Sequence, residues 1–203
     1  TWNSYNPETL TLGGQTSGTD AGSYTATFTP MEGYTWGDGT NTTKEVTWTI
    51  GRATISTTPT QSGSLTYTGS AQSPSWSNYD SSKLTIGGTT SGTNAGSYNA
   101  TFTPTSNYQW SDGGTGAKTV AWKIGKAAGS LSLNKTSITL NKSTSATTIT
   151  VTRAGDGAIT ATSSSTSVAT VSVSGNTVTV TGKAYGSATI TVKVAEGTNH
   201  TAP

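Results

Sequence analysis

The sequence contains no cysteine among its 203 residues. It can therefore form no disulfide bond, and it offers neither a thiol nucleophile nor a thiolate ligand for zinc. A small β domain without disulfides must draw its stability from packing and backbone hydrogen bonds. The missing cysteine thus excludes a disulfide scaffold and thiol chemistry.

Histidine is almost as scarce, since His200 is the only one. A Ser-His-Asp triad would have to use this residue, which lies near Pro203 in a tail that we expect to be frayed. The nine acidic residues show no spacing that suggests a pair of glycosidase carboxylates. No glycine-rich phosphate motif leads into a helix. We therefore expect no enzymatic activity, no metal site and no cofactor.

Charge is also sparse: charged residues make up 10% of the chain, and the formal net charge is +2. The lysines and arginines are scattered, so there is no basic stripe of the kind that binds nucleic acid. No segment approaches the roughly 18 consecutive apolar residues of a membrane span. The sequence predicts neither nucleic-acid binding nor membrane insertion.

What the chain does contain is an internal repeat. Residues 84–127 restate residues 10–53 without insertion or deletion, at a constant offset of 74 positions. The offset joins three aromatic pairs, which are Trp2 with Trp76, Tyr24 with Tyr98, and Trp48 with Trp122. A repeat of domain size indicates stacked copies of one unit, and such arrays usually space, display or bind.

Apolar residues alternate with polar ones in short runs, which is typical of half-buried strands. Tyr98, Ala100 and Phe102 share one face of such a run, and Val120 begins another that continues to Ile124. The strands expected in the second repeat are residues 55–60, 65–70, 84–86, 98–103 and 118–124, with a long loop at 104–118. No segment sustains a helical period, so the predicted fold is all-β.

A local motif narrows the fold class. Asp20-Ala21-Gly22-Ser23-Tyr24 and its copy Asn94-Ala95-Gly96-Ser97-Tyr98 each place an Asx residue four positions before a strand-opening tyrosine. This resembles the tyrosine corner of immunoglobulin-like domains, in which the phenol bonds back to the chain a few residues upstream. The resemblance implies tandem immunoglobulin-like β-sandwiches without disulfides.

The sequence changes type from Leu131 onward. Strands are expected at residues 137–140, 148–152, 159–163, 169–173, 177–181 and 187–194, with a tight hairpin turn at Ser174-Gly175-Asn176. The runs Ser167–Val171 and Val178–Val192 closely resemble group 2 bacterial immunoglobulin-like domains. The two upstream repeats resemble, more loosely, the modules that accompany this domain in surface proteins and prophage tail proteins of Gram-positive bacteria.

We therefore expect three domains: 1–53, an N-terminally incomplete repeat; 54–127, a complete repeat; and 128–203, a group 2 domain without its last strand. The first repeat has no counterpart to residues 54–74. One interpretation is that the sequence is a segment of a longer chain. The alternative is that neighbouring subunits supply the missing strands, because an open sheet edge can accept a strand from another chain.

One loop recurs in both repeats and could bind a ligand. Its candidate residues are Tyr34, Trp36 and Asp38, with the copies Tyr108, Trp110 and Asp112. Aromatic rings beside a carboxylate can stack on sugars; alternatively, the tryptophan fills the core and Asp-Gly forms the turn. Calcium at Asp38 or Asp112 is a weaker reading, because one carboxylate provides too few ligands. Lys44 or Lys118 could also donate the amine of an isopeptide crosslink.

These expectations combine into one function. The chain is predicted to be a non-enzymatic structural and adhesive array, extracellular, on a bacterial surface or a phage virion. The resemblance implies weak contacts to host or bacterial surface glycans, which would sum through multivalency. The alternative is a subunit of an extracellular filament that assembles head-to-tail by strand complementation. A third reading is a non-catalytic appendage of an enzyme.

Overall fold

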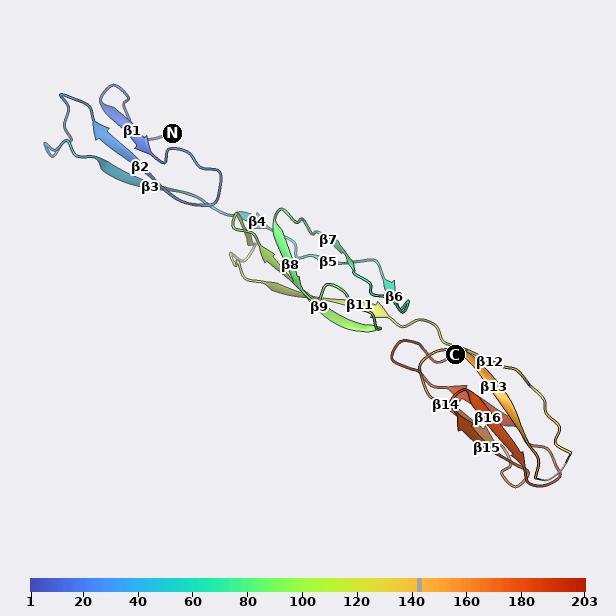
Figure 1. The fold of residues 1–203 in the computed structure, drawn as a ribbon. Helices are drawn as coiled ribbons and strands as arrows, with labels where there is room; N and C mark the ends of the chain where they lie inside the picture. The colour runs from blue at the N-terminus through green and yellow to red at the C-terminus, as the bar shows by residue number, and fades with distance from the viewer. Residues whose placement is uncertain (142–143) are drawn as a thin grey trace. The chain divides into compact units, whose positions relative to one another are not determined.

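The computed structural model describes residues 1–141 and 144–203 and contains only strands, turns and loops in them (Figure 1). The predicted all-β class is confirmed. The chain divides into two compact units. Unit 1 comprises residues 1–60, 77–88 and 101–120; unit 2 comprises residues 61–76, 89–100 and 121–203.

The first repeat lies in unit 1 and forms an antiparallel sheet with the strand order β1-β2-β3. The strands are β1 (Leu10–Gly14), β2 (Gly22–Pro30) and β3 (Lys44–Ile50). Alternation along β2 buries Ala26 and Phe28, which are 0% and 7% exposed. The Trp2 ring packs edge-on against Phe28 with the ring centroids 5.3 Å apart. Such an edge-to-face arrangement is a favourable geometry for two aromatic rings.

The second repeat contributes a four-stranded sheet of order β6-β11-β9-β8 and two smaller pairings. Its strands are β4 (Ala53–Ile55), β5 (Thr60–Ser62), β6 (Leu65–Thr66), β7 (Ser75–Ser77), β8 (Leu84–Gly88), β9 (Gly96–Pro104), β10 (Tyr108–Trp110) and β11 (Lys118–Gly125). The expected strands 98–103 and 118–124 are confirmed as β9 and β11.

Three sequence predictions in the second repeat are wrong. The strand expected at 65–70 is reduced to the two residues of β6, Leu65–Thr66. Residues 104–118 are not all loop, because β10 forms there and pairs in parallel with β4. The expected strand 55–60 is replaced by β4 and β5 on either side of Pro59, which has no N–H to donate to a strand partner. The second repeat has buried apolar residues in each unit. They are Leu84, Phe102 and Trp110 in unit 1, and Ala100, Trp122 and Ile124 in unit 2.

The C-terminal part of unit 2 has two sheets, with the orders β12-β13-β16-β15 and β14-β17. The strands are β12 (Ser130–Leu133), β13 (Ala146–Ala154), β14 (Ile159–Ser163), β15 (Ala169–Ser174), β16 (Thr177–Gly182) and β17 (Ile190–Val194). Ile149, Val151, Val178 and Val180 form the buried centre. The predicted hairpin is confirmed, since Ser174 pairs with Thr177. The strand expected at 137–140 does not form.

Candidate functional site

The recurring loop of the first repeat is held together by Asp38. Its Oδ1 accepts hydrogen bonds from the Thr40 N–H at 3.0 Å and the Thr40 hydroxyl at 2.6 Å. Lys44 Nζ lies 2.9 Å from Asp38 Oδ2 and 4.9 Å from the centroid of the Trp36 ring. The hydrogen bonds from Thr40 and then from Lys44 hold the pKa of Asp38 well below its usual range.

The copy in the second repeat uses the same contacts. Asp112 Oδ1 accepts a hydrogen bond from the Gly114 N–H at 2.8 Å, and Lys118 Nζ lies 3.0 Å from Asp112 Oδ2. Lys118 Nζ also sits 4.8 Å from the Trp110 ring centroid. The Gly114 and Lys118 hydrogen bonds lower the pKa of Asp112. In both copies the carboxylate closes a turn and anchors a lysine over the tryptophan ring.

The tryptophans of the two loops differ in exposure. Trp110 is 2% exposed and donates its Nε1–H to the Gly116 carbonyl at 2.8 Å. Trp36 makes the equivalent bond to the Thr42 carbonyl at 2.8 Å but is only half-buried. Tyr34 is 49% exposed, whereas its copy Tyr108 is half-buried within β10. A ligand could therefore reach the aromatic side chains of the first repeat and not the Trp110 ring.

Calcium binding and an isopeptide crosslink, the other two hypotheses for these loops, find little support in the contacts. Asp38 and Asp112 are each occupied by a lysine and by turn donors. Within the described residues, no three His, Cys, Asp or Glu side chains are grouped so as to hold a metal ion. Lys44 and Lys118 form ion pairs with aspartate carboxylates at exposed positions, so we infer that these pairs hold the loops closed. The sequence did not reveal the pairs.

The tyrosine corners form as the sequence predicts. Tyr24 donates its hydroxyl to the Asp20 carbonyl, and Tyr98 to the Asn94 carbonyl, each at 2.6 Å. Tyr98 also stacks on Trp122 with the ring centroids 4.5 Å apart. These bonds fix the chain just before β2 and β9. Because the same corner is present twice, both repeats present a turn closed by the same hydroxyl-to-carbonyl bond at this end of the strand.

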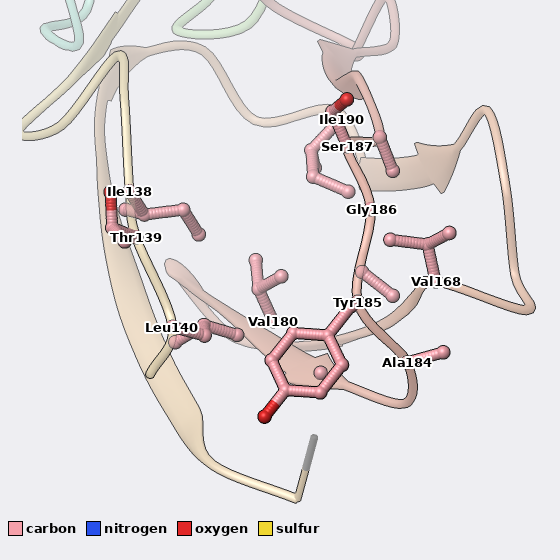
Figure 2. Close-up of a pocket in the computed structure, with 13 residues that line it drawn as sticks. Ile138, Thr139, Leu140, Val168, Val180, Ala184, Tyr185, Gly186, Ser187 and Ile190 are labelled. Carbon is pink, nitrogen blue, oxygen red and sulfur yellow. The ribbon is translucent and has the colours of Figure 1, made fainter. Parts of the chain in front are cut away.

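A small slot with a mixed polar and apolar lining lies in the C-terminal part of unit 2 (Figure 2). Its volume is about 280 Å³, and its walls come from residues 138–140 on one side and from residues 184–188 and Ile190 on the other. Ile138, Leu140 and Val180 contribute apolar side chains to this lining. Tyr185, at the rim, is 89% exposed. A slot of this size suits side chains of an extended segment rather than a large ligand.

The C-terminal part of the chain matches a known protein family. Residues 127–202 match the profile of the bacterial Ig-like domain (group 2) family. The resemblance identified from the C-terminal sequence is therefore confirmed for this segment, and the two β-sheets of residues 130–194 agree with it. No curated protein sequence matches the chain.

The group 2 Ig-like domain carries a coarse functional meaning. Such domains are generally non-catalytic, and they typically occur in extracellular or surface proteins with a structural or adhesive role. In the part of the chain that the structure describes, no helix is long and apolar enough to cross a membrane. The two repeats upstream lie outside the matched residues, and their division into domains stays a prediction.

The group 2 Ig-like domain also holds the single histidine. His200 Nδ1 lies 3.2 Å from Asp156 Oδ1, and its ring packs edge-on against Tyr67. His200 forms a parallel bridge with Ala127, so the expectation of a frayed tail is wrong. Desolvation raises the pKa of Asp156, but hydrogen bonds from Asn199 and His200 outweigh it and lower the pKa overall. The histidine thus joins the group 2 domain to the preceding repeat.

Proposed function

We propose that this chain is a non-enzymatic spacer that displays weak binding surfaces outside a bacterial cell or on a phage virion. One observation carries the proposal: the two linkers between neighbouring domains, residues 50–53 and 125–130, are each hydrogen-bonded into the domain that follows. The Ala53 N–H donates to the Asn107 carbonyl at 2.8 Å within unit 1. The Ala127 N–H donates to the Asn199 carbonyl at 2.9 Å within unit 2.

Side chains reinforce both joints. Arg52 Nε donates to the Ser106 carbonyl at 2.9 Å, and Lys126 pairs with the Glu196 carboxylate. Arg52 and Lys126 precede the two linker alanines at equivalent positions, so each joint uses a cationic residue there, arginine at the first and lysine at the second. A linker bound in this way leaves little slack. A chain without slack between its domains is suited to holding a surface at a fixed spacing.

The displayed surface proposed here is the aromatic loop of the first repeat. Tyr34 is 49% exposed, and Trp36 beside it is half-buried under Lys44. Exposed aromatic rings next to hydrogen-bonding groups are suited to stacking on the apolar faces of sugars. A single loop of this kind binds weakly, so adhesion would depend on many copies acting together. Cell-wall or host surface glycans are the proposed partners.

Multivalent binding tests this function. Beads that carry many copies of the chain should be retained on purified wall glycans, whereas the free monomer should be washed off. Tyr34→Ala should release the beads, and Tyr34→Phe, which keeps the ring, should not. Beads that fail to bind any wall or host glycan would contradict adhesion. Release of sugar fragments by the chain would contradict the non-enzymatic assignment.

Assembly by strand exchange is a second candidate, and the slot lined by residues 138–140 favours it. In the second repeat β11 pairs with β6 through Ile124 and Leu65. Ile138-Thr139-Leu140 resembles Leu65-Thr66-Tyr67, because each has an aliphatic residue, a threonine and then an apolar or aromatic residue. Residues 138–140 line the slot and form no strand pair among the described residues. A strand from a neighbouring subunit could fill this place.

Light scattering over a wide concentration range, with electron microscopy of the same samples, separates the two candidates. Strand exchange predicts polymers that grow with concentration and that Ile138→Lys, a charge in the slot, abolishes. The spacer function predicts a monomer at every concentration. A wild-type monomer at high concentration would contradict the filament.

A further inference from the structure

We propose that an asparagine amide clamps each domain to a fixed turn on the domain before it; this inference rests on the proposed spacer function. At the first joint the clamp is Asn107. Its Oδ1 accepts a hydrogen bond from the Ala21 N–H at 2.7 Å, and its Nδ2 donates to Asp20 Oδ1 at 2.7 Å. All three residues lie in unit 1, although Asn107 is 86 positions away from Ala21.

The second joint repeats the clamp with a different domain type. Asn199 Oδ1 accepts from the Ala95 N–H at 2.8 Å, and its Nδ2 lies 3.3 Å from Asn94 Oδ1. Asn94 and Ala95 follow Asp20 and Ala21 at the repeat offset. A repeat and a group 2 domain therefore use the same atom types to engage the same turn. We call Asp20-Ala21 and Asn94-Ala95 the receptor turns.

Each receptor turn is preorganised by the tyrosine corner. The carbonyl that accepts the Tyr24 hydroxyl belongs to Asp20, the residue whose carboxylate meets the clamp. The Tyr98 hydroxyl fixes Asn94 in the same way. The turn is thus held in place before the next domain arrives, which lowers the entropic cost of the contact. The tyrosine corner, otherwise an internal feature of one domain, supports a surface for its neighbour.

The clamp asparagines are fixed as well. The Asn107 carbonyl accepts from the linker Ala53 N–H, and the Asn199 carbonyl from the linker Ala127 N–H, so each asparagine touches both the linker and the receptor turn. The Asn199 N–H also donates to Asp156 Oδ2 at 2.9 Å. Each clamp asparagine therefore connects a linker alanine to a receptor turn.

The arrangement has a direction. The first repeat has Gly33 where the second has Asn107, so it offers a receptor turn and no clamp amide. In the group 2 domain the residues before Gly186-Ser187, which match Gly96-Ser97, are Ala184 and Tyr185. That domain carries the clamp without an Asx receptor. The partner that fits a receptor turn is therefore a following domain with a carboxamide at the clamp position.

Hydrogen-bond chemistry dictates which residues can pair. Asp20 only accepts, and the Ala21 N–H only donates, so the clamp needs both an acceptor and a donor, which asparagine provides. Asn107→Asp would bring a second carboxylate against Asp20. Asn94→Asp adds the same charge to the second joint, but it recreates the Asp-Asn pairing of the first. The two substitutions change charge equally and should have opposite effects.

Spin-label distance measurements on the full chain test this pairing, because the absence of native cysteine allows labels at two introduced cysteines. Thr11 and Ser111 report on the first joint, and Ser75 and Ser172 on the second; all four are exposed. Wild type and Asn94→Asp should give one narrow distance distribution at each joint. Asn107→Asp should lose the narrow distribution at the first joint only, and adding Asp20→Asn should restore it.

The outcomes distinguish the clamp from the spacer function. A narrow first-joint distribution in both Asn107→Asp and Asn107→Ala would overturn the clamp and leave the spacer function standing. A broad distribution in the wild-type chain would contradict the spacer function itself. If Asn107→Asp lowers the melting temperature of the domains and Asp20→Asn does not restore the joint, Asn107 has an internal structural role and the clamp is overturned.

Discussion

Trp36 and Trp110 show how one residue pattern can serve two situations. They occupy equivalent positions, make equivalent Nε1–H bonds and lie under equivalent lysines. Only Trp110 is packed into a core, at 2% exposure. The sequence alone offered both a core and a binding interpretation for this residue. The burial favours the core for Trp110 and leaves the ring of Trp36 accessible.

Truncating the two tryptophans should therefore have unequal costs. Trp110→Ala should lower the free energy of unfolding by about 3–5 kcal/mol, because it removes a fully buried aromatic side chain. Trp36→Ala should cost clearly less, since its ring is already partly in water. Urea denaturation of the two variants measures the difference. Equal losses would contradict the assignment of Trp110 to the core.

The tyrosine corner gives a second test at the residue scale. Tyr98→Phe removes the hydrogen bond to the Asn94 carbonyl but keeps the ring stacked on Trp122. The expected loss is about 1 kcal/mol in the free energy of unfolding. Tyr34→Phe, at an exposed ring, is the matched control and should change little. No difference between the two variants would mean that the corner bond adds nothing.

The turn at Asp80, whose carboxylate accepts hydrogen bonds from Ser82, gives a prediction for pH dependence. The Ser82 side chain, followed by Lys83, lowers the pKa of Asp80 to about 2. Because this value lies below the roughly 3.9 of an unfolded aspartate, the turn is stabilised above that pH. The stabilisation is then lost as the pH falls through the lowered pKa. Carboxyl NMR titration should find Asp80 titrating at about 2; a midpoint at the ordinary value would contradict the Ser82 and Lys83 contacts.

At the scale of elements, the sequence predicts strands whose own alternation buries one face. This is why β9, β14 and β16 are found close to their predicted bounds. It fails for β10, whose three residues form a strand only because β4, more than 50 positions away, pairs with them. It also fails at 137–140, where the apolar alternation is present but no neighbouring strand is paired with it.

The same reasoning explains what was missed at the candidate sites. The aromatic-Asp loops and the tyrosine corners repeat in the sequence and could be recognised from it. Asn107 and Asn199 could not, because their partners lie in the preceding domain and the residues around them differ. The available signal was an asparagine directly before an aromatic residue, Tyr108 or His200, at equivalent places after a strand. This signal indicates a contact with the preceding domain only once the structure of the joints is known.

At the scale of the whole molecule, linker and side-chain contacts tie neighbouring domains within each unit. Three features recur at both joints. They are a hydrogen bond from the linker alanine, a cationic residue directly before that alanine, and an asparagine amide bound to the preceding domain. The group 2 family match gives the C-terminal domain its surface-protein context. A spacer function depends on these joints, so its central claim concerns motion between neighbouring domains.

Residual dipolar couplings of backbone amides in a weakly aligned sample test that claim most directly. The account predicts that couplings from the first repeat and from the unit 1 residues of the second repeat fit one common alignment tensor. The residues of unit 2 on either side of Ala127 should likewise share one tensor. Separate tensors of different magnitude on the two sides of a joint would show freely moving domains and would contradict the account.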